Sequence, residues 1–241
     1  ADGRWSGLCR AGGTTVNRLG RSQTGTNALG SRTMTGRGAA LNMGGGKLDI
    51  AGGATLSGAT GKILLGGSAG ELNIGGAVAM TGNGTSEKID LGGGKLSLTG
   101  GGAISGAGAL KGTGAVTVGG TGTTLTISGA NTGLSATVAI TDTNTLRAGA
   151  FNALGSGKIT VGGELAFTGN AAAAALVNEI AFGTGSSPPL SFANASGVVS
   201  GNFTGAGGQI NLTGPSAVDL HGETRLTASA FDVAAGASLT A

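Results

Sequence analysis

Gly46-Lys47-Leu48-Asp49-Ile50 is a stretch that the chain repeats, with changes, at three later places. These places are Gly61-Lys62-Ile63-Leu64-Leu65, Gly94-Lys95-Leu96-Ser97-Leu98 and Gly157-Lys158-Ile159-Thr160-Val161. In each stretch a Gly-Lys pair precedes apolar residues that lie two positions apart. Alternation at period two predicts a short β-strand with one buried face.

The same pattern continues, with variations, from about residue 44 to the end of the chain. Glycine punctuates it at nearly every turn, and the sequence contains 54 glycines and only three prolines. Many short, evenly spaced strands fit a sandwich, a barrel or a solenoid. Strands of three to five residues are too short for a good sandwich face, and glycine-rich corners suit stacked turns that need positive φ. The sequence therefore predicts an all-β protein, a β-solenoid whose coils vary in length.

Composition excludes several other classes. Glycine follows no strict three-residue period, so the chain is not collagen-like. Apolar residues make up 39% of the chain, more than a disordered chain carries. Cys9 is the only cysteine, which rules out an intrachain disulfide and a thiolate metal cluster. No transmembrane segment is predicted, because the longest alanine-based apolar run, residues 171–177, is too short to span a bilayer.

Two regions are expected along the chain. Residues 44–241 form the β-solenoid body, with a possible short helix near 171–179 where the alanines cluster. Residues 1–43 show little alternation and are predicted to form an irregular Gly/Arg-rich arm or an N-terminal cap. Five of the six phenylalanines lie at or beyond Phe167, so a thicker core is expected in the C-terminal half.

Positive charge is concentrated in the first forty residues. That segment holds six arginines and one acid, Asp2, which gives +5, whereas residues 41–241 hold eight basic and ten acidic side chains, which gives −2. The segment is either a solvated arm or a surface that docks onto an acidic partner, such as a neighbouring subunit or an anionic polysaccharide. Nucleic acid is not predicted as a partner, because no recognition motif accompanies the charge.

Residues 122–167 carry a recognisable motif. Its matched elements are Leu125-Thr126-Ile127-Ser128-Gly129-Ala130-Asn131-Thr132, Thr145-Leu146 and Ala153-Leu154-Gly155-Ser156-Gly157. This resembles the autotransporter-associated β-strand repeat of passenger domains in bacterial type V secretion. Asn144 departs from it, standing where the family has a glycine before Thr-Leu. The resemblance implies a right-handed parallel β-helix exported to the bacterial cell surface, but no particular activity.

One stretch could carry acid–base chemistry. Period two places Asp219, His221, Glu223 and Arg225 on one face of a strand. An acid beside an imidazole could support general acid–base catalysis in a polysaccharide-active enzyme, and the same four groups could equally form a solvent-facing ladder of opposite charges. His221 is the only histidine, so a histidine-rich metal site is excluded, and no catalytic residue, metal or cofactor is predicted.

The sequence thus predicts a non-enzymatic, extracellular structural protein of the bacterial surface, a subunit that self-associates into a fibre or sheath. The alternative is an adhesin that binds cell-surface glycans or proteins through its lateral faces. Open coil ends of a solenoid expose unpaired backbone groups that favour edge pairing. The predicted subunit contacts are Arg4, Trp5, Arg10, Arg18, Arg21, Arg32, Arg37, Phe231, Val233 and Leu239.

Overall fold

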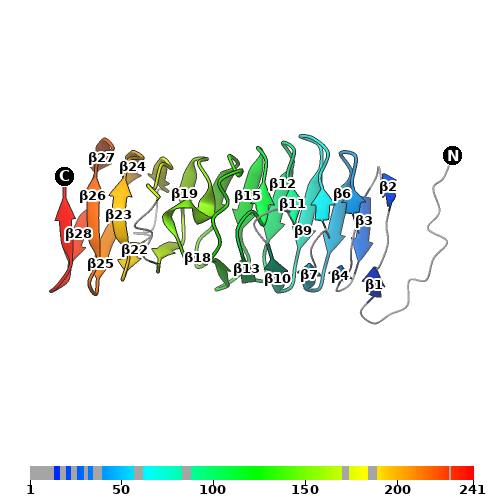
Figure 1. Ribbon diagram of the computed structural model, residues 1–241, viewed down its shortest axis with the longest axis horizontal. Helices are drawn as coiled ribbons and strands as arrows, with labels where there is room; N and C mark the ends of the chain where they lie inside the picture. The colour runs from blue at the N-terminus through cyan, green and yellow to red at the C-terminus, as the bar shows by residue number, and fades with distance from the viewer. Residues whose placement is uncertain are drawn as a thin grey trace.

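The computed structural model is a β-solenoid, an elongated stack of coils with its first and last described strands at opposite ends (Figure 1). It describes the strands at 14–16, 20–22, 26–29 and 32–34 by their backbone, and then residues 40–56, 62–82, 88–169, 174–183, 189–227 and 229–241. Every strand pairing in it is parallel, so each coil adds one strand to each neighbouring sheet. The predicted all-β parallel β-helix is confirmed.

The first sheet runs the length of the rod with 11 strands. In order along the rod these are β1 (Thr14–Val16), β4 (Arg32–Met34), β7 (Ala54–Leu56), β10 (Val78–Thr81), β13 (Gly102–Ser105), β16 (Thr124–Ile127), β18 (Thr145–Ala148), β20 (Glu164–Phe167), β22 (Pro189–Ala193), β25 (Gln209–Thr213) and β28 (Ala230–Val233).

The second sheet also runs the length of the rod, with 10 strands. They are β3 (Thr26–Leu29), β6 (Lys47–Ile50), β9 (Glu71–Ile74), β12 (Lys95–Leu98), β15 (Ala115–Val118), β17 (Thr137–Ile140), β19 (Ile159–Val161), β21 (Ile180–Phe182), β24 (Phe203–Ala206) and β27 (Thr224–Thr227).

The third face consists of two shorter sheets. Its N-terminal part contains β2 (Gly20–Ser22), β5 (Ala40–Asn42), β8 (Lys62–Leu64), β11 (Ile89–Asp90) and β14 (Leu110–Lys111). Its C-terminal part contains β23 (Ser196–Val199), β26 (Ala217–Leu220) and β29 (Ser238–Thr240). Between them lie the single bridges Gly112–Leu134 and Leu176–Val199 and the 3₁₀-helix η1 (Phe151–Leu154).

The coils vary in length, as the irregular repeat predicts. Leu72 pairs with Leu96, 24 residues later, whereas Leu146 pairs with Leu165 after only 19 residues. Solenoids tolerate such variation because each coil contacts only its neighbours. Glycine allows the close approach of successive corners at some positions: Gly102 has φ of 113°, and a Cβ there would lie 2.2 Å from the carbonyl oxygen of Val78.

The core consists of apolar side chains stacked coil upon coil. The alternating residues of each strand point inward, and at β12 this leaves Leu96 and Leu98 almost fully buried. In the C-terminal half the core includes Phe151, Phe167 and Phe192, with ring centroids 5.3 to 5.9 Å apart. This agrees with the thicker core expected there.

Two details differ from the sequence-based expectation. Strands β1 to β5 lie within residues 14–42, in the stretch expected to be an irregular arm or cap. Of these, β3, β4 and β5 pair in parallel with strands of the body, and β1 and β2 pair in parallel with β4 and β5. Their apolar alternation is interrupted by polar residues, which is why the sequence did not show them. Near the expected helix at 171–179, residues 174–179 are not helical, and Leu176 lies in a β-bridge instead.

Candidate interaction surfaces

The candidate acid–base residues fall on two sheets rather than on one strand. Asp219 belongs to β26 of the third face and Arg225 to β27 of the second sheet, with a corner at His221 and Gly222 between them. They form two separate pairs: His221 Nε2 lies 2.9 Å from Asp219 Oδ2, and Arg225 Nη2 lies 2.7 Å from Glu223 Oε1. All four side chains are exposed, so the geometry is that of one surface ion pair, Arg225–Glu223, and one surface contact between His221 and Asp219.

Among the described residues, no group of three or more histidine, cysteine, aspartate or glutamate side chains is placed to hold a metal ion. No helix in the described part of the chain has the length and hydropathy needed to cross a membrane.

The predicted contacts of the basic segment are only partly described. Arg4, Trp5, Arg10, Arg18 and Arg37 lie outside the described residues. Arg21 lies in β2 and Arg32 in β4, where the backbone alone is described.

The predicted contacts at the other end form the last coil of the rod. Phe231 and Val233 belong to β28, and Leu239 belongs to β29. Phe231 pairs with Ile210 and Val233 with Leu212 in the first sheet. Ile210 and Leu212 are at most 1% exposed, whereas Phe231 is 44% and Val233 43% exposed. Leu239 is partly buried and packs against the core. These three residues therefore continue the inner stacks of the rod, and β28 is the outermost strand of its sheet.

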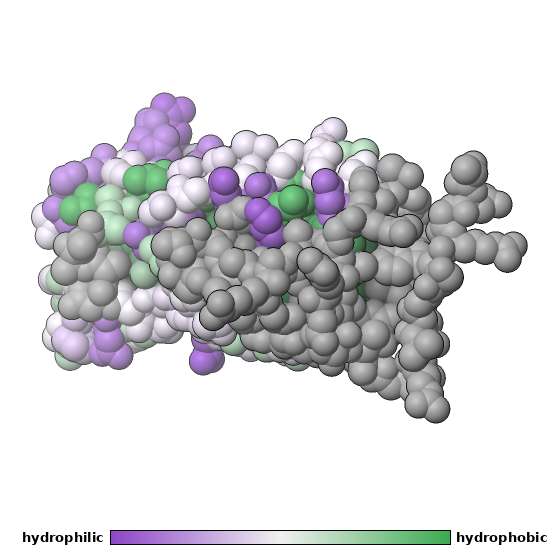
Figure 2. All heavy atoms as spheres, turned by 45° about the vertical axis from the view of Figure 1, so that its right-hand side comes forward, coloured by the Kyte–Doolittle hydropathy of each residue, from purple (hydrophilic) through white to green (hydrophobic). Residues whose placement is uncertain are grey.

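The lateral surface of the rod is mildly polar. In Figure 2 most of the described surface is white or pale, with purple groups and green areas of limited extent. The outward residues of β7, β10, β13 and β16 carry no charge and are mainly alanine, serine and threonine. Charged side chains recur instead on the outer face of the second sheet.

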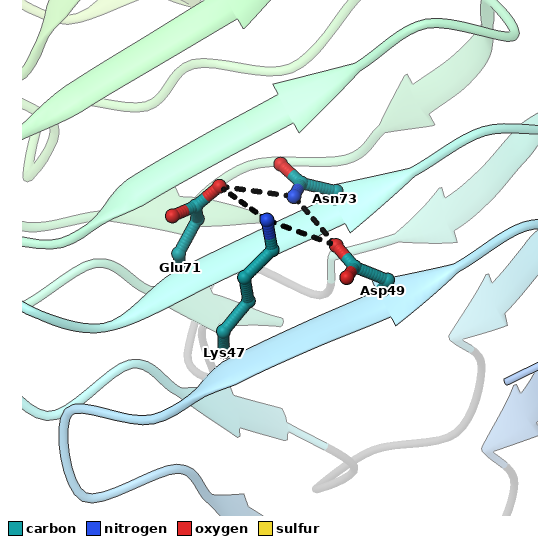
Figure 3. A network of polar contacts seen from close by, with 4 residues as sticks. All are labelled: Lys47, Asp49, Glu71 and Asn73. Carbon is teal, nitrogen blue, oxygen red and sulfur yellow. Dashed lines mark hydrogen bonds and ion pairs between the residues drawn. The ribbon is translucent and has the colours of Figure 1, made fainter. Parts of the chain in front are cut away.

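A polar network occupies the N-terminal end of that outer face (Figure 3). Lys47 Nζ lies 3.3 Å from Glu71 Oε1 of the next coil and 3.7 Å from Asp49 Oδ1 of its own strand. Asn73 Nδ2 donates to Asp49 Oδ1 at 2.7 Å and to Glu71 Oε1 at 3.0 Å. The four side chains thus link β6 to β9 across the surface.

This network shifts the acid–base equilibria of its members. The hydrogen bond from Asn73, together with the ammonium of Lys47, holds the pKa of Glu71 below its ordinary value. The hydrogen bond to Glu71 and the charge of Asp49 raise the pKa of Lys47. Both groups are therefore held in their charged forms. Farther along the same face, Lys158 Nζ lies 2.8 Å from Glu179 Oε1 and lowers the pKa of that carboxyl group.

Two buried asparagines join neighbouring coils through side-chain hydrogen bonds, a role that was not predicted from the sequence. Asn131 is fully buried: its Oδ1 accepts from the amide of Leu110 in the preceding coil, and its Nδ2 donates to the carbonyl of Ala153 in the following one. Asn144 accepts from both the amide and the hydroxyl of Thr123 and donates to four oxygens. The only signal for Asn144 was its departure from the repeat, where it replaces a glycine at a corner.

Comparisons with protein-family models, with curated proteins and with solved structures return no match.

Proposed function

We propose that this chain is a non-enzymatic structural protein of the bacterial surface, a β-solenoid subunit whose rods join end to end into a fibre or sheath. One observation carries the proposal: Phe231 and Val233 of the last coil continue the inner stacks of Ile210 and Leu212, yet their side chains are 44% and 43% exposed. Large apolar side chains on a strand edge with unpaired backbone groups favour the addition of another strand.

The covering coil in this proposal comes from a second copy. A copy shifted along the rod would bring its own outermost strands, β1, β2 and β3, next to β28, β29 and β27. All pairings within the rod are parallel, so the same strand direction would continue across the joint. Such a contact is head-to-tail and does not close on itself, so it generates a filament rather than a dimer.

The apolar part of the joint is localised. Besides Phe231 and Val233, the last coil supplies Leu226 of β27 and Leu239 of β29, both partly buried against the core. Burying them would remove apolar area from water at about 25 cal/mol per Å². Phe231, Val233 and Leu239 lie over Ile210, Leu212 and Val218, respectively. A coil that continues these stacks would keep the register of the coils within the rod.

The surface location rests on the resemblance of residues 122–167 to the autotransporter-associated repeat. The non-enzymatic assignment is supported by Asp219, His221, Glu223 and Arg225, which form two separate exposed pairs rather than one cluster.

Negative-stain electron microscopy of Phe231→Asp beside the unaltered chain tests end-to-end joining. A carboxylate at that position would be buried unpaired in the joint, so we expect fibres from the unaltered chain and isolated rods from the variant. Val177→Asp is the matched control, because Val177 is 49% exposed but lies on the side of the rod. Isolated rods from the unaltered chain at every concentration, or fibres from Phe231→Asp, would contradict the proposal.

Adhesion is the second proposed function, supported by the lateral surface. The uncharged outward residues of β7, β10, β13 and β16 form a regular array of hydroxyl and methyl groups, suited to weak contacts with a repetitive partner such as a glycan. Agglutination of cells by rods of Phe231→Asp would support display without fibre formation. If Phe231→Asp abolishes agglutination together with the fibres, adhesion belongs to the assembled fibre.

A further inference from the structure

The outer face of the second sheet carries its charges in two columns. Each coil from β6 to β27 has two outward positions on this face, aligned coil by coil by the strand register. The first position lies within the strand from β6 to β17 and just before the strand from β19 to β27, where backbone hydrogen bonds join it to the preceding coil. The first column contains Lys47, Glu71, Lys95, Ala115, Thr137, Lys158, Glu179, Asn202 and Glu223. The second column contains Asp49, Asn73, Ser97, Thr117, Ala139, Thr160, Ala181, Thr204 and Arg225.

The order of charges in these columns reverses from one end to the other. Among the strands whose side chains are described, the two columns begin at the N-terminal end with Lys47 and Asp49 and finish at the C-terminal end with Glu223 and Arg225. Strand β3 precedes them in the sheet, and only its backbone is described. Lys95 is third from one end of the first column, and Glu179 is third from the other. The centre, Thr137 and Ala139 on β17, is small and uncharged.

We propose that two copies of the chain pack side by side through this face, antiparallel along the rod. A two-fold axis parallel to the strands, passing over β17, would place each column of one copy against the same column of the other in reverse order. Lys47 then faces Glu223, Asp49 faces Arg225, and Lys95 faces Glu179, each of these contacts occurring twice. Glu71 faces Asn202 and Lys158 faces Ala115, so no like charges meet.

Other alignments fit less well. Shifting the partner by one coil in one direction brings Glu71 against Glu223. Shifting it in the other direction brings Glu71 against Glu179 and Lys95 against Lys158. Like charges placed together suppress such registers. Rods packed parallel to each other would retain only the Lys47–Asp49 and Glu223–Arg225 contacts, four contacts rather than six.

The shape of the face also suits a second copy. Its middle strands β15 and β17 present alanine and threonine, which allow two sheets to approach to about 10 Å, and the long side chains other than Lys158 lie toward its ends. Nine strands at ~4.8 Å and four residues at ~3.3 Å give a footprint of roughly 560 Å² per copy. That is smaller than the ~800 Å² per partner of a standard interface, so we expect a weak, salt-sensitive dimer.

This contact is separate from the end-to-end joint, because it uses a lateral face rather than Phe231 and Val233. It is tested in the full chain carrying Phe231→Asp, so that end-to-end growth does not contribute. If the proposed joint does not exist, that substitution leaves the measurement unaffected.

Charge reversal tests the pairing by sedimentation equilibrium from micromolar to millimolar concentration. Lys95→Glu would place two glutamates together at both symmetry-related contacts, and we expect the dissociation constant to rise about tenfold. Glu179→Lys should weaken the dimer similarly, and the double variant should restore it because the opposite charges are exchanged. Arg147→Glu is the matched control on the exposed face of β18, with the same change in net charge, and should leave the dimer unchanged.

Cross-linking tests the direction of the rods. In the antiparallel arrangement Ala139 faces its own copy in the partner, whereas in a parallel one it faces Thr137. With Cys9→Ser as background, Ala139→Cys should therefore cross-link to itself through a bismaleimide with a span of about 10 Å, the spacing of packed sheets. Thr55→Cys on the first sheet should not. A monomer at all concentrations, a dimer indifferent to Lys95→Glu, or absence of the Ala139→Cys cross-link would overturn the proposal.

Discussion

The coils around β6 and β9 carry a network of exposed polar side chains, whereas the coils around β16 and β18 bury two hydrogen-bonded asparagines. In the first region Lys47, Glu71 and Asn73 form an exposed network over an aliphatic core. In the second, Asn131 and Asn144 are fully buried and lie in the coils next to a cluster of phenylalanines. Surface ion pairs contribute little to stability, whereas a buried polar group costs free energy unless every bond is made. The two regions therefore fix the stacking of coils by different means.

The largest expected effect lies in the phenylalanine cluster. Phe192→Ala should cost about 3–5 kcal/mol, because it opens a cavity between Phe151 and Phe167. Leu98→Ala in the aliphatic region should cost about 2–5 kcal/mol, a range that begins lower. Hydrogen exchange should show the loss of protection localised to β20, β22 and β25, since each coil contacts only its neighbours. Uniform loss along the rod would show that the two regions unfold as one unit.

An intermediate effect is expected for the buried asparagines. Asn144→Ala should cost about 1–3 kcal/mol, because the amide of Thr123 and several corner carbonyls lose their partner inside the protein. Asn73→Ala, its counterpart at the surface, should cost less than about 1 kcal/mol, because water replaces the lost bonds. Urea unfolding of the two variants measures the contrast. Equal losses would remove the distinction between inner and outer polar groups.

The smallest effect is a dependence on pH in the surface network. The pKa of Glu71 lies below 4.5 in the folded chain, so its contribution is complete above that pH and is lost as the pH falls through the folded value. Thermal unfolding should therefore show slightly more acid destabilisation in the unaltered chain than in Glu71→Gln, by less than about 1 kcal/mol at this exposed site. If acid destabilised Glu71→Gln more than the unaltered chain, the carboxylate of Glu71 would not be stabilised by Asn73 and Lys47.

The sequence was sufficient for the fold where alternation was regular. Apolar pairs such as Leu96 and Leu98 predicted inward stacks, and these residues are almost fully buried. Apolar alternation did not predict β1 to β5, because polar residues interrupt it there. It did not predict the bridge at Leu176 either, because a single bridge needs only one inward residue. Buried asparagines could not be predicted either, because their burial depends on bonds to coils about 21 residues away.

The arrangement of the candidate site residues was predicted less well from the sequence than the fold was. Period two placed Asp219, His221, Glu223 and Arg225 on one face, but the corner after β26 divides them between two sheets. Phe231 and Val233 were predicted as subunit contacts, and their exposure at the last coil is consistent with that prediction without testing it. The charge reversal on the second sheet requires the register of nine strands, which alternation alone does not supply.

The orientation of the ladders has a mechanical consequence. All strands lie across the rod, so the hydrogen bonds that join successive coils run along its axis. A force applied to the two ends of the chain would therefore break these bonds one coil at a time rather than shear a whole sheet at once. Each coil of 18 to 26 residues would release roughly 60–90 Å of extended chain. The rod would then lengthen in many small steps and absorb tension as a graded extensible element.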